Sequence, residues 1–152
     1  MNEVKEGLKI RGEVIVEEIN PVTREVISRE VAPNIICVDG ATTLAWAITS
    51  AVPPAWFNYM NLSTDFAAVS RATTTLPGYN RCSTLITPTV LGSVTTWTNL
   101  FVAQAGASPI WKFGMTQRAA NTGLLWNAVL FGASKDNTNN DMQVTYNASF
   151  AP

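Results

Sequence analysis

The sequence contains no histidine, has only two cysteines and carries few charged residues beyond its first thirty positions. Without histidine there is no Ser-His-Asp or Cys-His pair to activate a nucleophile, and no imidazole to bind a metal ion. Two cysteines, Cys37 and Cys82, cannot form a tetrahedral zinc site by themselves. We therefore expect no enzymatic activity, no catalytic residues, no cofactor and no metal.

Long apolar runs are also missing. The first thirty residues hold no apolar stretch typical of a signal peptide, and no stretch of the chain is long and apolar enough to cross a membrane. The two cysteines are interpreted as small buried apolar side chains, with a disulfide left open as the alternative. We expect no membrane partner.

Charge is scarce and unevenly placed. Ten basic and eleven acidic residues give a net charge of -1, too little positive charge for nucleic acid to be the main partner. Residues 1–30 hold 12 of these 21 charges. Two interpretations of the remaining, charge-poor chain compete: a β domain that exposes Thr and Asn, or a surface covered by neighbouring chains, where charge would be costly to bury.

The chain of 152 residues is long enough for one domain. We expect a flexible arm at residues 1–7 and a single β domain at residues 8–152. That domain is divided by charge into a hairpin at residues 8–31 and a charge-poor body at residues 32–152.

Alternating apolar and polar residues predict the strands of the hairpin. In residues 8–19 the even positions from Leu8 to Val16 share one face and the charged side chains the other, with Ile15 and Ile19 as exceptions. A turn at Asn20-Pro21 leads to a second strand at residues 24–31, and a short apolar strand is predicted at 35–38. Further strands, rich in Val, Thr and aromatic residues, are predicted at 56–62, 80–87, 93–103, 109–115, 124–131 and 142–150.

One short helix is predicted at about residues 39–50. Asp39 can cap its start, apolar residues from Ala41 to Ile48 recur at helical spacing, and Pro53-Pro54 ends it. The fold class is thus mainly β. Short strands separated by turns predict an antiparallel β-sandwich, or a barrel of the Greek-key or jelly-roll kind.

Two further features have competing interpretations. The loop at residues 134–141 contains Asp136 and Asp141, which suit either a turn or a Ca²⁺ ion held by oxygen ligands. Five tryptophans either pack in the core or bind sugar rings. Trp56, which follows two prolines, is expected to be the most exposed.

Weak motifs follow one another along the chain at residues 33–36, 40 with 44–45, 59–62, 75–76, 110–115, 124–131 and 142–150. These segments span nearly the whole chain, and their order resembles a pattern shared by many tailed-phage virion proteins of this size. Ser63 stands where that pattern has glycine, and Lys112 where it often has an acid. Within this group the chain is most similar to the small capsid decoration, or cement, proteins.

The resemblance implies a protein made in the host cytoplasm that trimerises on the virion capsid and stabilises the shell through non-covalent contacts. Its partners would be the major capsid protein, or another virion protein, and further copies of itself. A tail or fibre component and a carbohydrate-binding surface module are the alternatives. The candidate partner-binding residues are Val4, Leu8, Ile10, Arg11, Arg24, Arg29 and Trp56.

Overall fold

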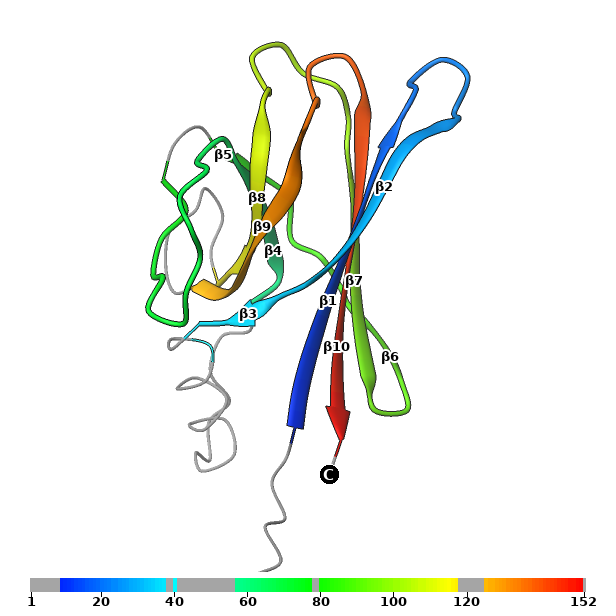
Figure 1. The fold of residues 1–152 in the computed structure, drawn as a ribbon. Helices are drawn as coiled ribbons and strands as arrows, with labels where there is room; N and C mark the ends of the chain where they lie inside the picture. The colour runs from blue at the N-terminus through cyan, green and yellow to red at the C-terminus, as the bar shows by residue number, and fades with distance from the viewer. Residues whose placement is uncertain (1–8, 38–39, 41–56, 78–79, 118–124, 152) are drawn as a thin grey trace, which may run out of the picture.

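The computed structural model describes residues 9–37, 40, 57–77, 80–117 and 125–151. In this part of the chain two antiparallel sheets of five strands each lie face to face (Figure 1). The prediction of a mainly β, antiparallel sandwich is therefore confirmed. The predicted helix at residues 39–50 lies outside the described residues except for Gly40, which is in helical conformation.

The first sheet, sheet A, contains the two strands of the charged hairpin. Its strand order is β2-β1-β10-β7-β6, so the first and last long strands of the domain pair side by side. This pairing aligns Lys9 with Ala151 at the end of the sheet where β10 finishes (Figure 1). The strands are β1 (Lys9–Ile19), β2 (Val26–Pro33), β6 (Thr89–Leu91), β7 (Val94–Phe101) and β10 (Asp141–Ala151).

The second sheet, sheet B, has the order β3-β9-β8-β4-β5. Its strands are β3 (Ile35–Ile36), β4 (Tyr59–Ser63), β5 (Asn80–Cys82), β8 (Ile110–Thr116) and β9 (Leu125–Lys135). The strand predicted at residues 80–87 is thus much shorter, β6 was not predicted, and β9 continues into the predicted 134–141 loop. Cys37 and Cys82 are not joined by a disulfide.

The exceptions in the alternation of β1 have a structural reason. Val14 and Val16 are fully buried, as the pattern predicted. Ile15 lies on the opposite face, where it aligns with Val31 of β2 and Thr145 of β10. Ile19, the last residue of β1, is also buried, beside a bulge in β2 where Ser28 aligns with Glu18 and Val26 with Ile19.

The hairpin turn is held by a side chain. The Asn20 Oδ1 atom accepts hydrogen bonds from the backbone N–H groups of Val22, at 2.8 Å, and Thr23, at 3.0 Å. Arg24 then adopts a left-handed conformation with φ of 65°. This is the local competition by which Asn favours a turn over a continuing strand.

The core between the sheets is aromatic and includes a polar group, the Tyr146 hydroxyl. The Tyr146 hydroxyl is fully buried and accepts hydrogen bonds from Trp126 Nε1, at 3.1 Å, and Asn34 Nδ2, at 3.3 Å. Burial raises the pKa of Tyr146. Because buried phenol and indole groups need partners, this set of hydrogen bonds lets both rings lie in the core.

Acidic side chains of the hairpin join the two sheets along one side of the sandwich. Glu30 accepts hydrogen bonds from the Gly132 N–H and from Lys135 Nζ of β9, both at 2.7 Å. Glu18 accepts one from the Asp136 N–H at 2.6 Å. Some of the charged side chains of the hairpin therefore stabilise the fold. None of the helical structure in the described residues is long and apolar enough to span a membrane.

Candidate interaction surface

The outer faces of the two sheets differ in what lies over them. The outer face of sheet B is covered by residues 64–77, which follow β4, and we call it the covered face. Lys112, only 2% exposed there, forms an ion pair with Asp65 of the covering segment. The Ser63 hydroxyl donates a hydrogen bond to the Pro77 carbonyl, and Leu76 is fully buried in a small apolar cluster with Leu125.

The outer face of sheet A is different, since its side chains are half-buried or exposed. Alternation fixes which residues point outward, because Val144, Tyr146 and Ala148 of β10 point into the core. We define the open face as the outward positions of β10, β7 and β6. They are Gln143, Thr145, Asn147, Ser149, Val94, Thr96, Thr98, Leu100, Thr89 and Leu91.

No residue of the open face is charged. Six of the ten are Thr, Asn or Gln, which both donate and accept hydrogen bonds. Thr96 donates to Asn147 at 2.8 Å, and the Thr98 and Thr145 hydroxyls lie 3.4 Å apart. Exposed apolar side chains stand among them, with Leu91 at 85% and Leu100 at 40% exposure. Such a surface can be covered by protein without removing an ion from water.

Charged side chains lie on the outer face of sheet A at its hairpin side. Arg11, Glu13 and Glu17 of β1 and Arg29 of β2 point outward, and Glu17 aligns with Arg29 across the strand pair. Arg11, Glu13 and Arg29 are exposed. The outer surface of sheet A is thus divided into the uncharged open face and a border that carries both signs of charge.

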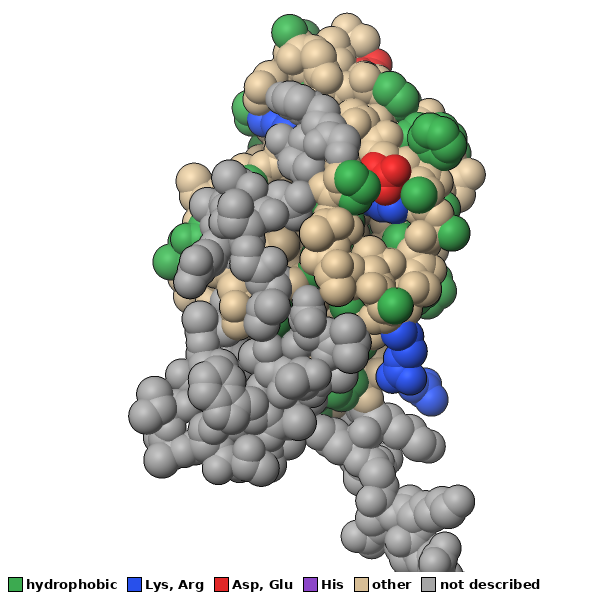
Figure 2. All heavy atoms as spheres, turned by 90° about the vertical axis from the view of Figure 1, so that its left-hand side faces the viewer, with side chains coloured by type: hydrophobic (Ala, Val, Ile, Leu, Met, Phe, Trp, Pro, Cys, Tyr) green, Lys and Arg blue, Asp and Glu red, His purple; other side chains and the backbone are tan. Residues whose placement is uncertain are grey.

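The turn and the edge strand of the hairpin add exposed apolar side chains. Val22 in the turn is 87% exposed, and Val26, Ile27 and Val31 of β2 are 51%, 56% and 44% exposed. A long, apolar edge strand is a feature that soluble proteins usually protect. Figure 2 presents the other side of the molecule, that of sheet B, where blue and red side chains are also few among the green and tan ones.

The predicted partner-binding residues fall into four groups. Val4, Leu8 and Trp56 lie outside the described residues. Arg11 and Arg29 lie on the charged border, whereas Ile10 is half-buried and aligns with Phe150. Arg24 donates a hydrogen bond from its guanidinium to Asp141 at 2.6 Å, so this side chain also has an internal role.

The described carboxylates of the body, and Glu30 of the hairpin, are held by internal donors. The Lys112 ammonium holds the pKa of Asp65 below its ordinary value, and the Asn139 amide does the same for Asp136. The Ala103 N–H and the Arg24 guanidinium lower the pKa of Asp141. Burial alone would raise the pKa of Glu30, but the Gly132 N–H and Lys135 outweigh it and the pKa is lowered.

These carboxylates are ionised and hydrogen-bonded, which suits a structural role. A group that transfers protons works best with a pKa near the working pH. Asp136 accepts hydrogen bonds from the backbone N–H groups of Thr138, at 2.8 Å, and Asn139, at 3.2 Å, which is the turn role considered for it. Within the described residues no group of three or more His, Cys, Asp or Glu side chains could hold a metal ion.

Two of the three tryptophans that can be placed lie in or against the core. Trp126 is 7% exposed within it and Trp97 packs against it, whereas Trp111 is half-buried. Trp97 stacks on Tyr146 with ring centroids 5.3 Å apart. Trp46 and Trp56 lie outside the described residues.

Sequence reasoning missed the open face, although part of its signal was present. Thr96 and Thr98, and Gln143, Thr145 and Asn147, recur at every second position of predicted strands, as uncharged outward residues should. What was missing was the knowledge that β7 and β10 are neighbours. No known protein family matches this sequence, and neither the curated proteins nor the solved structures include a match to it.

Proposed function

We propose that this chain is a non-enzymatic structural protein of a tailed-phage particle, most like a capsid decoration protein, that works by packing against other protein chains. The observation that carries the proposal is the open face: ten outward side chains on three adjacent strands without a single charge. The resemblance in the order of segments is the reason for proposing that the chain belongs to a virion.

The physical case concerns the free energy of removing side chains from water. Charged residues are depleted at the cores of protein interfaces, because a buried ion must recover the hydration that it loses. Thr, Asn and Gln side chains exchange hydrogen bonds with water for hydrogen bonds with a partner at a lower cost. The border that carries Arg11, Glu13 and Arg29 has the polar character of an interface rim, where opposite charges favour one orientation of the partner.

A decoration role requires no reaction. A protein that binds the assembled shell, and not its separated parts, stabilises the shell by mass action. That stabilisation is about 2.7 kcal/mol per site when the free protein is at about a hundred times its dissociation constant. Summed over many equivalent sites, modest contacts would hold a large particle together.

The direct test uses one substitution on each outer face. Thr98→Lys places a charge on the open face, and Thr75→Lys places the same charge on the exposed surface of the covering segment. We expect the unmodified chain to form oligomers in sedimentation velocity, Thr98→Lys to shift it to monomers, and Thr75→Lys to leave it oligomeric. A monomeric unmodified chain at high concentration, or equal behaviour of both variants, would contradict self-association through the open face.

Location in the particle distinguishes the alternatives. Antibodies against this chain, visualised by immunogold labelling of intact particles, should lie over the head if it is a decoration protein. Label over the tail would replace this assignment with a tail or fibre component. Absence of label from particles whose genome encodes the chain would contradict a virion role altogether.

A further inference from the structure

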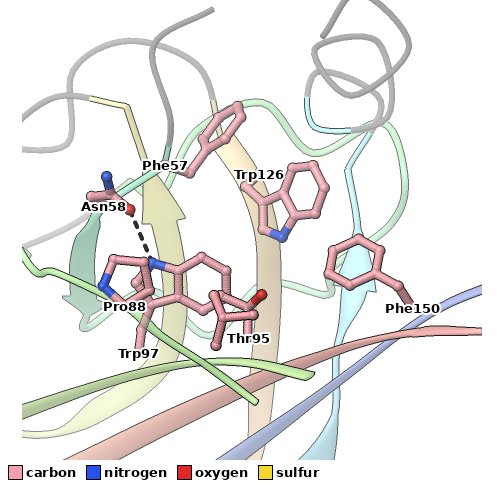
Figure 3. Close-up of a pocket in the computed structure, with 8 residues that line it drawn as sticks. Phe57, Asn58, Pro88, Thr95, Trp97, Trp126 and Phe150 are labelled. Carbon is pink, nitrogen blue, oxygen red and sulfur yellow. Dashed lines mark hydrogen bonds between the residues drawn. The ribbon is translucent and has the colours of Figure 1, made fainter. Parts of the chain in front are cut away.

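A cavity of about 350 Å³ opens between the two sheets, at the end of the sandwich where Phe150 precedes the end of β10. Sheet A contributes Val90, Thr95, Trp97 and Phe150 to its walls. Trp126 of β9 lines it from sheet B. The described residues around it are Phe57, Asn58, Pro88, Val90, Thr95, Trp97, Trp126 and Phe150 (Figure 3).

The tryptophan side chains present carbon atoms to the cavity because their indole N–H groups donate hydrogen bonds to other residues. Trp97 Nε1 donates a hydrogen bond to Asn58 Oδ1 at 3.0 Å, as the dashed line in Figure 3 marks. Trp126 Nε1 donates to the Tyr146 hydroxyl at 3.1 Å. Six of the eight described side chains that line the cavity are apolar, so among these residues only the Thr95 hydroxyl and the Asn58 amide add polar groups. A sugar ring, with several hydroxyl groups to satisfy, would find too few partners among the described residues that line the cavity.

The rings that form the walls are held in place by other rings. Trp97 stacks on Tyr146 at an interplanar angle of 24°, and Trp126 packs against Phe57 with centroids 5.4 Å apart. Trp126 and Phe57 are 7% and 4% exposed. A cavity with walls fixed in this way is largely formed before a ligand arrives, which lowers the entropy lost on binding.

We infer that this cavity is a binding site for a small, uncharged, planar apolar molecule. The size supports it, because an apolar cavity of about 150 Å³ is enough to bind benzene, and this one is more than twice as large. The ring character of the ligand follows from the four aromatic walls, since aromatic rings gain additional stabilisation from offset or edge-to-face contacts. This inference does not depend on the open face or on a role in a virion.

The test uses N-phenyl-1-naphthylamine, an uncharged fluorescent molecule with planar rings. We expect one molecule to bind per chain in calorimetry, with energy transfer from the tryptophans that line the cavity. Thr95→Phe, which fills the cavity, should raise the dissociation constant at least about tenfold. Thr96→Phe is the matched control, because the neighbouring residue points to the opposite face of the strand and should change the constant by less than about twofold.

A second pair of variants tests the inference if Thr95→Phe does not fold. Val90→Phe changes a side chain that lines the cavity and is 69% exposed, and Leu91→Phe changes the adjacent outward one. Equal affinities within both pairs, or no binding to the unmodified chain, would overturn the inference. Equally tight binding of dodecanol would overturn the preference for rings, and displacement of the probe by N-acetylglucosamine would overturn the apolar ligand.

Discussion

The covered face and the open face belong to sheets of the same size, but charged side chains are buried on the covered face and absent from the open face. The covered face buries an ion pair, Lys112 with Asp65, beneath a segment of its own chain. The open face has no ion and no covering segment among the described residues. A buried charge is tolerated on sheet B because residues 64–77 deliver its partner, whereas the open face avoids charge altogether.

The difference between the two faces indicates where contacts with other chains are expected. Among the described residues, ionic side chains lie mainly where their partners are internal, as with Glu30 and Lys135. A broad region of strand surface without charge is therefore more informative than the charged hairpin, which we had expected to contact partners. Substitutions on the covered face should lower the unfolding free energy, whereas substitutions on the open face should change the oligomeric state.

The largest expected effect is on the covered face. Asp65→Ala removes the partner of a lysine that is 2% exposed, and breaking a buried pair on one side typically costs about 3–5 kcal/mol of unfolding free energy. Urea denaturation measures the loss. The double variant Asp65→Ala, Lys112→Met should recover most of it, because no unpaired charge remains. A single variant as stable as the unmodified chain would show that Lys112 is not buried.

A smaller effect is expected from packing beneath the covering segment. A Cβ atom at Gly114 would lie 2.7 Å from Leu76 Cδ1 and 2.9 Å from the Asn127 carbonyl oxygen. Gly114→Ala should therefore destabilise the fold by about 1–3 kcal/mol in thermal or urea unfolding. Gly132→Ala, in the adjacent strand, is the control, because the nearest atom there is Glu30 Oε1 at 3.4 Å. Equal stability of the two variants would contradict this packing.

Acid should weaken the fold through the carboxylates that have internal partners. Asp65 and Asp141 have pKa values below the ordinary 3.8, and Glu30 lies below 4.5. Because the unfolded chain then binds more protons, the stability from these groups is complete above the ordinary values and is lost as the pH falls through the lower folded values. Urea midpoints at pH 7 and pH 3 measure this. A fold more stable at pH 3 would contradict the assignment.

The smallest effect on stability should come from the open face. Thr98→Lys adds a charge to an exposed position that no described segment covers, so the unfolding free energy of the monomer should change by less than about 0.5 kcal/mol. Urea unfolding at low protein concentration checks this. Any loss of assembly by the same variant would then reflect the interface and not misfolding. A large destabilisation would mean that the face is already covered within the chain.

The sequence predicted most of the strands because alternation is a local signal. The faces of β1 followed from Val14 and Val16, and the turn at Asn20 from its side-chain chemistry. The shortness of β5 and the existence of β6 were not predictable in this way. Residues 83–88 have the composition of a strand, but the backbone N–H groups of Ser83 and Ile86 donate to Met60 and Asn58 in irregular hydrogen bonds.

The candidate surface and the cavity were less accessible to sequence reasoning. Lys112 was predicted only to lie in the strand at residues 109–115, and the covering segment brings Asp65 to it, 47 positions away along the chain. Trp97 and Trp126 were correctly expected within strands. Their shared cavity depends on two different sheets meeting at one end.

By itself the sequence determined the class of fold, the pattern of inward and outward residues on the long strands, and an inventory too poor for histidine-based catalysis. These depend on neighbours along the chain and on composition. Tertiary structure alone decided that β10 lies between β1 and β7, which assembles the open face, and that two tryptophans from opposite sheets enclose a cavity. The physical reason is that strand pairing and sheet stacking join residues far apart in sequence, and alternation carries no record of which strands will meet.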